Sequence, residues 1–160
     1  MTKKVKYSLR DGRQSDFDFL YKLNKATMKD HVIHTWGKWD EEWQVKYFQE
    51  KFKPEISKII LIEGKEAGAM AIIEDERKMD IERLLILPEF QSLGIGSAIL
   101  EDLIQQADKK SKSLCLSVLQ SNERARKLYL KRGFRITEET EERSYMTYNE
   151  SHKNTSPNTA

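Results

Sequence analysis

The sequence predicts an α/β (α+β) fold in which about four helices accompany a mixed central sheet of about seven strands. Two patterns support this prediction. Residues 58–87 hold three short apolar runs joined by tight connections, which is typical of an antiparallel meander. Residues 95–110 then form an amphipathic segment between a glycine turn and another apolar run, which indicates a helix that crosses over between parallel strands.

The N-terminal part is predicted to be a strand at residues 4–9, followed by two helices. Ser15 is expected to cap the first helix, with Asp18 three residues on as its acidic partner. A loop at residues 34–39 separates this helix from the second, which Asp40 caps. The other predicted elements are strands at residues 58–63, 68–74, 79–87, 114–119, 134–139 and 143–148, and helices at residues 95–110 and from Ser121 to Gly133.

Length and composition favour one soluble domain. The chain of 160 residues is interpreted as a single domain over residues 1–148, with a polar tail at residues 149–160 that is expected to be disordered. The net charge of only +2 argues against a nucleic-acid binder driven by a broad basic face. No apolar run is long enough to span a membrane and the N-terminus lacks a signal sequence, so we expect a cytoplasmic protein without a membrane partner.

The sequence also predicts that the protein holds no metal. Its one cysteine, Cys115, excludes an internal disulfide and a cysteine-based metal cluster, and its place in an apolar strand is typical of a small buried hydrophobe. His31 and His34 have no further histidine or cysteine nearby to complete a metal site.

A glycine-bearing turn, Gln91-Ser92-Leu93-Gly94-Ile95-Gly96, lies between a predicted strand and the helix at residues 95–110. Two glycines at a helix start let a ligand approach the backbone without interference from a Cβ atom. The first amides of the helix have no partner inside it, and the helix dipole favours an anion there, above all phosphate. A P-loop is excluded because Ser97-Ala98 stands where Lys and Ser/Thr are required. A dinucleotide fold needs a third glycine and a later acidic residue, and both are missing.

Two further features follow the turn at fixed places. Asn122 stands just past the next strand, and Tyr129 comes seven residues later, ahead of Gly133-Phe134. Together with Ile86-Leu87-Pro88-Glu89-Phe90 before the turn, this pattern resembles the GNAT superfamily of acyl-coenzyme A dependent N-acetyltransferases over roughly residues 4–148. The resemblance implies acetyl-CoA as co-substrate, a GNAT-like sheet splayed between its fourth and fifth strands, and direct attack by a primary amine in a ternary complex.

The resemblance also implies where the coenzyme binds. The pyrophosphate would lie on the backbone amides from Leu93 to Ser97, and the pantetheine arm would pair with the preceding strand like an added strand. Asn122 would hydrogen-bond this arm; alternatively, Ser121 or Asn122 merely caps a helix. The residues assigned to the coenzyme are Leu85, Ile86, Leu87, Gln91, Ser92, Leu93, Gly94, Ile95, Gly96, Ser97, Asn122, Arg126 and Tyr129.

One position departs from the family pattern. Leu93 stands where the family often has Arg or Lys, so a phosphate-facing cation is lost there. Arg126, or one of its basic neighbours Arg124, Lys127 and Lys131, would then contact the 3′-phosphate of the coenzyme. Basic residues on a helix are also commonly just solvated, and that alternative stays open.

Tyr129 and Glu82 are the candidate catalytic residues. The resemblance implies that the Tyr129 phenol protonates the leaving thiolate as a general acid, although its helical spacing also suits a core tyrosine. Glu82 would take the proton of the attacking amine directly or through water, with Asp80 as the second candidate; a merely solvated Glu82 and a water chain are the alternatives. A backbone amide near residues 84–86 would stabilise the carbonyl oxygen as it gains negative charge.

An aromatic loop points to the acceptor. Trp36, Trp39 and Trp43 stand near Asp40, Glu41 and Glu42, and aromatic walls with nearby carboxylates suit a cationic amine. Trp36, Trp39 and Glu82 are therefore the candidate acceptor residues, whereas a core Trp43 and helix-capping acids are the alternative. A small-molecule amine is the favoured acceptor, with a peptide N-terminus or lysine, or a non-catalytic CoA-binding module, as alternatives. The protein is expected to be a monomer or a homodimer.

Overall fold

The structure, a computed structural model, describes residues 5–148, and the predicted tail at 149–160 lies outside the described residues. The described part holds seven strands and four α-helices, as the sequence predicts, in a sheet ordered β1-β2-β3-β4-β5-β7-β6. The strands are β1 (Ser8–Asp11), β2 (Ser57–Ile62), β3 (Lys65–Glu74), β4 (Lys78–Ile86), β5 (Ser113–Leu119), β6 (Arg135–Glu139) and β7 (Arg143–Tyr148); the helices are α1 (Phe17–Trp36), α2 (Glu41–Lys51), α3 (Ile95–Lys110) and α4 (Glu123–Lys131).

The described residues divide into two compact units. Residues 5–71 and 83–96 form the first unit, and residues 72–82 and 97–148 form the second. The division passes through β3 and β4, so each unit contains part of both strands. No helix of the described residues is long and apolar enough to cross a membrane.

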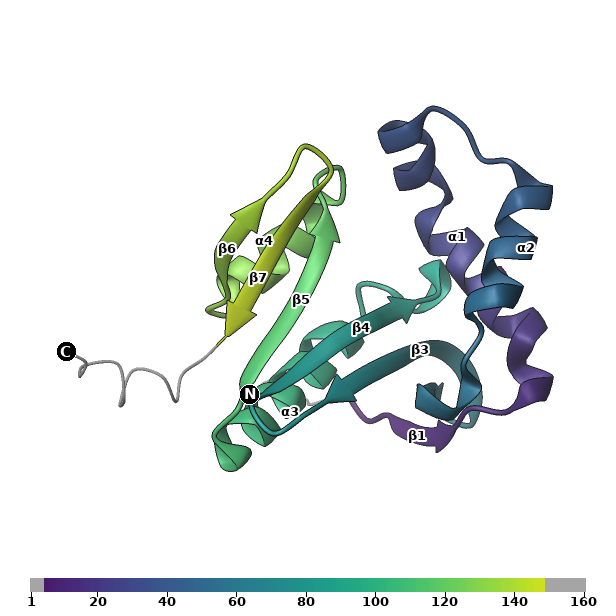
Figure 1. The fold of residues 1–160 in the computed structure, drawn as a ribbon. Coiled ribbons are helices and arrows are strands. Elements are labelled where there is room, and N and C mark those ends of the chain that lie inside the picture. Colours follow the sequence, from purple (N-terminus) through teal and green to yellow (C-terminus); the bar gives the residue numbers. More distant parts are fainter. Residues whose placement is uncertain (1–4, 149–160) are drawn as a thin grey trace. The chain divides into compact units, whose positions relative to one another are not determined.

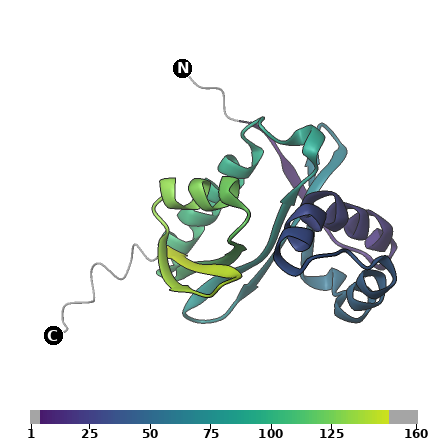
Figure 2. The same ribbon diagram turned by 90° about the horizontal axis from the view of Figure 1, so that it is seen from above.

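In the first unit, a helical pair packs on an antiparallel meander. β1 pairs antiparallel with β2, and β2 pairs antiparallel with β3. α1 and α2 lie side by side in both ribbon views (Figure 1, Figure 2). The buried cluster that joins helices and strands consists of Leu20 and Leu23 of α1, Phe48 of α2, Ile59 of β2 and Ala69 of β3. Burial of these apolar side chains, rather than helix propensity, therefore fixes the helical pair on the meander.

In the second unit, a parallel and an antiparallel pairing meet at β5. The beginning of β4 pairs parallel with β5, from Lys78–Ser113 to Ile81–Leu116, although β4 continues to Ile86 and β5 to Leu119. β7 pairs antiparallel with β5 and with β6. This is the mixed sheet that the sequence predicts. α3 buries the predicted stripe, Ile95, Ile99, Leu103 and Ala107.

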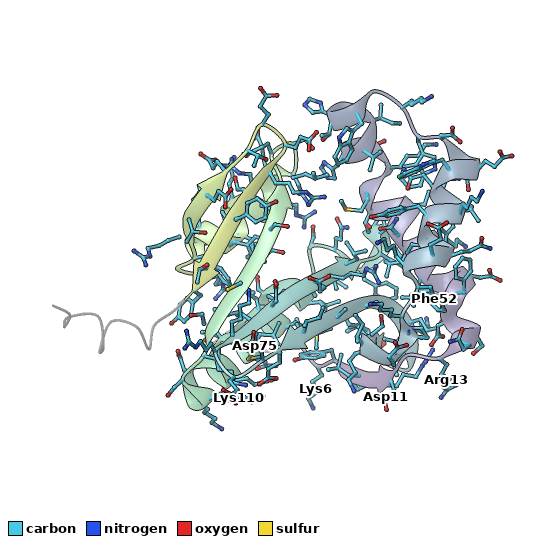
Figure 3. All side chains as sticks on the ribbon, in the orientation of Figure 1. Lys6, Asp11, Arg13, Phe52, Asp75 and Lys110 are labelled. Carbon is cyan, nitrogen blue, oxygen red and sulfur yellow. The ribbon has the colours of Figure 1, made fainter. Side chains whose placement is uncertain are left out.

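A short turn joins β3 and β4. The Asp75 carboxylate accepts hydrogen bonds from the backbone amides of Arg77 at 2.7 Å and Lys78 at 2.9 Å. Lys110 of α3 donates to Glu74 at 3.0 Å, beside this turn, and Figure 3 labels both Asp75 and Lys110. These contacts close the charged run between β3 and β4 into a short turn.

Two predictions for the N-terminal part are wrong. The first strand covers Ser8–Asp11 instead of residues 4–9, of which Lys4 lies outside the described residues. Ser15 is not the helix cap, because a 3-10 turn at Gln14–Asp16 precedes α1. The buried Asp16 carboxylate accepts from the backbone amide of Arg13 at 2.8 Å and pairs with Arg10 at 2.9 Å. This carboxylate pairing, which joins the end of β1 to the helix start, moves both boundaries.

The loop expected at residues 34–39 is shorter than predicted. α1 continues through Trp36 and ends at Gly37, whose φ of 96° is the left-handed conformation typical of a helix C-terminus. Asp40 caps α2 as predicted, since its carboxylate accepts from the backbone amide of Trp43 at 3.1 Å. The helical pair is therefore joined by a tight connection of residues 37–40.

Gly68 of β3 allows the end of β4 to pack closely against β3. A Cβ atom at Gly68 would lie 2.2 Å from the carbonyl oxygen of Leu85 and 3.1 Å from the Cα atom of Ile86. The backbone amide of Leu87 also donates to the carbonyl of Ala67 at 2.8 Å. β3 and β4 thus approach each other so closely at Gly68 that a side chain would not fit. Glycine inside a strand is typical of such a close approach.

We predict that Gly68→Ala destabilises the fold by about 2 kcal/mol or more, because the new Cβ atom would push Leu85 away from β3. Urea unfolding would measure the change. Gly64→Ala is the matched control, because Gly64 has open space at its Cβ position and only its φ of 79° disfavours alanine. A Gly68→Ala protein as stable as the wild type would contradict the steric argument.

Candidate functional site

The glycine turn is exposed and contains two residues with left-handed backbone conformation. Ser92 and Gly94 both have positive φ, 69° and 85°, and residues 92–94 are exposed. α3 begins directly after them at Ile95, as the amphipathic pattern predicts. Turns with left-handed residues direct successive backbone amides to one side, and the first amides of a helix have no partner within it.

Gly96 is a glycine that internal packing does not require. A Cβ atom there would meet no atom of the described residues within 4 Å, and its φ is not positive. Gly94 differs, because its φ of 85° favours glycine and a Cβ atom would lie 3.4 Å from Val5. The open space above the Gly96 backbone is what close approach by a ligand needs.

Gln91 joins this turn to the end of β4. Its side-chain amide donates to the carbonyl oxygen of Ile86 at 2.9 Å. Since the Leu87 amide faces β3, the peptide groups of Ile86 are expected to face the other edge of the strand. Gln91 therefore holds the carbonyl of one residue predicted to line the pantetheine arm and fixes the turn relative to that strand.

Asn122 is the N-cap of α4. Its Oδ1 atom accepts from the backbone amide of Ala125 at 3.3 Å, so the capping alternative describes part of its role. Its side-chain NH₂ group is a donor that this cap does not use. Asn122 can therefore cap the helix and still donate to a ligand.

Tyr129 is a buried phenol on α4. The side chain is 9% exposed, and its ring lies 5.7 Å from that of Phe134. Burial raises the pKa of Tyr129 to about 12, so the phenol stays protonated over the neutral range. Within the described residues, no hydrogen bond of its hydroxyl to a side chain or backbone group is present. The group is protonated as a general acid must be.

The other predicted residues have differing surroundings. Glu82 is exposed on β4, and Leu93 is 54% exposed in the turn. Arg126 of α4, expected near the 3′-phosphate, has its guanidinium 3.6 Å from the Glu139 carboxylate of β6. Gln91, Leu93 and the aromatic loop belong to the first unit, whereas Glu82, Asn122, Arg126 and Tyr129 belong to the second.

The Glu41 carboxylate holds the aromatic loop through three contacts. Glu41 accepts hydrogen bonds from the Trp39 indole at 2.9 Å and the Tyr21 hydroxyl at 2.8 Å, and pairs with Lys25 at 2.7 Å. Lys25, then Trp39 and Tyr21, lower the pKa of Glu41 to about 2. Burial and the Glu41 contact raise the pKa of Tyr21 to about 12. Glu41 therefore connects α1 to the start of α2, and its charge is already matched by Lys25.

Trp43 is not a core residue, which overturns the core alternative. Its side chain is 55% exposed and stacks on Tyr47, itself 46% exposed, with ring centroids 4.9 Å apart. Trp36 is 49% exposed at the end of α1. The Trp39 indole is held by its hydrogen bond to Glu41. The exposed indole faces thus belong to Trp36 and Trp43.

Sequence reasoning missed two groups of residues. Gly68 carries a detectable signal, a glycine inside an apolar strand, which is typical of a close backbone approach. Gln120, Glu139 and Ser144 form a polar cluster in which Gln120 comes from a distant part of the chain, and no local pattern marks them. Side-chain pairing of this kind requires the folded register of β6 and β7.

The fold and the turn together define a class of protein. The described residues combine a mixed sheet of seven strands with an exposed glycine turn between β4 and α3, at the start of a helix. Residues 24–150 match the family model described as "Acetyltransferase (GNAT) domain". The chain therefore belongs to the GNAT acetyltransferase family, which confirms the resemblance seen in the sequence.

Solved structures share this fold. The PaiA N-acetyltransferase from Thermoplasma acidophilum, in complex with coenzyme A, has a TM-score of 0.70 at 18% identity, over 91% of this chain and 99% of that one. Naa50 from Arabidopsis thaliana, in complex with the bisubstrate analogue CoA-Ac-MVNAL, has a TM-score of 0.61 at 21% identity, over 90% and 99%. At these identities the likeness concerns the fold.

Curated relatives carry the same family name. Uncharacterized N-acetyltransferases of Mycobacterium bovis and Mycobacterium tuberculosis are 33% identical over 69 residues, 42% of this chain and 44% of the relatives. The match thus spans less than half the length of the curated relatives.

We predict that Glu41→Gln lowers the melting temperature at neutral pH, because a carboxylate with three partners is lost. The pKa of Glu41 is lowered in the folded state, so its contribution is present above about 4.5 and disappears as pH falls towards about 2. The difference between variant and wild type should shrink over that pH range, followed by circular dichroism. Glu42→Gln, in the same helix turn, is the control; equal melting of the two variants at pH 7 would refute the role of Glu41.

Proposed function

We propose that this protein is an acetyl-CoA-dependent N-acetyltransferase that transfers the acetyl group to a primary amine by direct attack in a ternary complex. The observation that carries the proposal is the open backbone at Gly96, in a glycine turn at the start of α3, in a chain of the GNAT family. The proposed phosphate-binding groups are the backbone amides from Leu93 to Ser97. The absence of a Cβ atom at Gly96 lets a pyrophosphate reach them.

The proposed reaction forms one bond and breaks another. The amine nitrogen attacks the thioester carbonyl carbon, the C–N bond forms, and the C–S bond breaks as the thiolate leaves. The Tyr129 phenol gives its proton to this sulfur, and its burial supports the role because it keeps the phenol protonated. Glu82, or a water molecule in contact with it, takes the proton that the amine loses. Glu82 is exposed, which suits transfer through water.

The coenzyme contacts of the proposal extend along β4. Leu85, Ile86 and Leu87 would flank the pantetheine arm, and the Asn122 side-chain NH₂ would donate to it. Arg126 is a weaker candidate for the 3′-phosphate, because its guanidinium already lies 3.6 Å from Glu139.

The proposed acceptor is a small-molecule amine bound at Trp36 and Trp39, of which Trp36 has the exposed aromatic face that suits a cation. A peptide acceptor is the second candidate. Structures of the same fold include Naa50 bound to the analogue CoA-Ac-MVNAL and the ribosomal-protein-S18-alanine N-acetyltransferase of Escherichia coli. A thiol-release assay on a panel of polyamines, amino sugars and short peptides separates the two, and thiol release with neither class would favour a CoA-binding module without catalysis.

We predict that Gly96→Ala weakens binding of CoA at least about tenfold, about 1.4 kcal/mol, because a methyl group would enter the phosphate position. Fold stability should stay unchanged or rise by up to about 1 kcal/mol, since alanine favours helices and has open space there. Isothermal titration with CoA and thermal melting measure the two effects. Gly94→Ala should instead lower stability, because its φ is 85°. Unchanged CoA affinity in Gly96→Ala would refute the phosphate assignment.

We predict that Tyr129→Phe lowers kcat about 10²-fold, within the roughly 10²- to 10⁴-fold that a general acid contributes, with little change in KM for acetyl-CoA. Stability should be preserved, because the hydroxyl has no hydrogen bond to lose within the described residues. Steady-state kinetics and melting measure these quantities. The matched control is Tyr145→Phe, an exposed tyrosine of β7. Equal kcat values for Tyr129→Phe and wild type would remove the phenol from the mechanism.

A further inference from the structure

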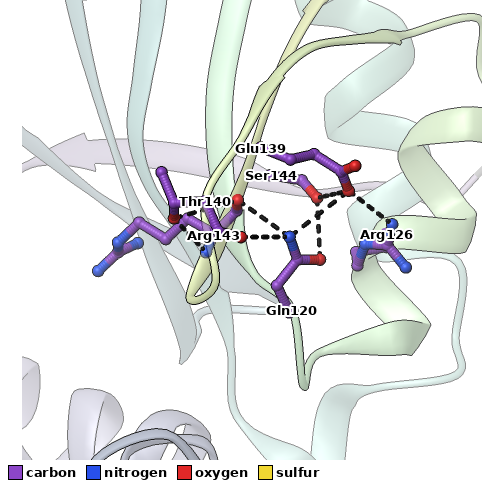
Figure 4. Close-up of polar contacts among 6 residues, drawn as sticks. All are labelled: Gln120, Arg126, Glu139, Thr140, Arg143 and Ser144. Carbon is purple, nitrogen blue, oxygen red and sulfur yellow. Dashed lines mark hydrogen bonds and ion pairs between the residues drawn. The ribbon is translucent and has the colours of Figure 1, made fainter.

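A polar cluster connects the β6–β7 hairpin to the turn that precedes α4 (Figure 4). The Gln120 side-chain amide, at the end of β5, donates to the carbonyl oxygens of Thr140 at 3.1 Å and Arg143 at 3.0 Å. Its backbone amide donates to the carbonyl of Glu142 at 2.8 Å. Gln120 thereby holds both sides of the hairpin turn. Asn122, the cap of α4, stands two residues further on.

Glu139 is the centre of this cluster. Its Oε2 atom lies 3.1 Å from the Ser144 hydroxyl and 3.6 Å from the Arg126 guanidinium. The Ser144 side chain is completely buried, and its hydroxyl also lies 3.0 Å from Gln120 Oε1. The single Ser144 proton can go to either of these two acceptors, so the buried hydroxyl has a partner in both cases and lies between Gln120 and Glu139.

Arg126 depends on Glu139 for its charge partner. The Arg126 Nε atom is buried and has no hydrogen-bond partner, so the guanidinium is held at its terminal nitrogen. Arg126 precedes Tyr129 by three residues on α4, a spacing that puts both side chains on the same side of the helix. An ion pair at Arg126 therefore anchors the helix face that carries the Tyr129 phenol.

We propose that Glu139 is a positioning residue that acts through Arg126 to set the placement of Tyr129. The inference rests on the proposed function, in which the Tyr129 phenol protonates the leaving thiolate. Among the described residues proposed for the coenzyme, Arg126 is the one that pairs with Glu139. The carboxylate holds α4 against the hairpin, with Gln120 and Ser144 fixing the carboxylate in turn.

The decisive variant is Glu139→Gln, which keeps the shape and an acceptor for Ser144 but removes the charge that holds Arg126. We expect kcat to fall about tenfold, a fraction of what a positioned general acid contributes, with unchanged KM for acetyl-CoA. Glu139→Asp, which keeps the charge, should recover part of the loss. Glu138→Gln is the matched control, because the neighbouring residue on β6 is exposed and points to the opposite face.

A double variant tests whether Glu139 acts through Tyr129. If Glu139 acts through Tyr129, Glu139→Gln should cause almost no further loss in a Tyr129→Phe background. Independent losses that multiply, or a changed KM for acetyl-CoA with unchanged kcat, would overturn the proposal. The second result would mean that freeing Arg126 alters coenzyme binding instead.

A readout without turnover separates this inference from the proposed function. The ring ¹³C signal of Tyr129, assigned by its loss in Tyr129→Phe, should shift in Glu139→Gln and stay unchanged in Glu138→Gln. An unchanged signal in Glu139→Gln would overturn the positioning role. Should the wild-type protein release no thiol with any amine, the proposed function fails, while the NMR comparison still decides whether Glu139 positions Tyr129.

Discussion

The close approach of β3 to the end of β4 is the constraint on which the proposed coenzyme strand depends. Gly68 leaves the room in which the Leu85 carbonyl lies, and the Leu87 amide donates to Ala67 beyond it. These contacts fix one edge of the strand from within the first unit. Gln91 then holds the Ile86 carbonyl and ties the glycine turn to the same segment. Strand and turn are thus linked by direct contacts, and such links are what a preorganised binding surface requires.

Apolar periodicity predicted most of the fold, because burial decides these elements. The pattern at residues 95–110 matches α3, and the terminal strand at 143–148 matches β7. The errors arise where polar contacts decide. The Asp16 carboxylate accepts a hydrogen bond from the Arg13 amide and pairs with Arg10. A 3-10 turn therefore forms where Ser15 was expected to cap the helix. A side chain that finds its partner on another element leaves no periodic signal.

In the candidate site, too, some features follow from local sequence and others depend on contacts between distant elements. The glycine turn and Asn122 act through backbone groups and short-range caps, which local sequence encodes, and the Asn122 cap forms with Ala125. The environment of Tyr129 was predictable only as a helix face, and its raised pKa follows from burial in the folded unit. The partner of Arg126 was not predictable at all, because Glu139 comes from another strand. The family resemblance suggested a phosphate partner for Arg126, and the fold places the Glu139 carboxylate beside it.

Ion pairs and hydrogen bonds within the aromatic loop limit the interactions that a cationic acceptor could make there. Lys25 pairs with Glu41, and the Asp40 carboxylate accepts from the first turn of α2, so both carboxylates already have partners within the protein. Exposed indole faces remain, on Trp36 and on Trp43 stacked with Tyr47. Attraction to a cation at such exposed faces is worth about 0.5–1 kcal/mol each, which is too little for selection by charge alone. Selectivity at this loop must therefore come from shape and apolar contact, and a cationic acceptor with an apolar body fits these faces better than a compact, strongly hydrated one.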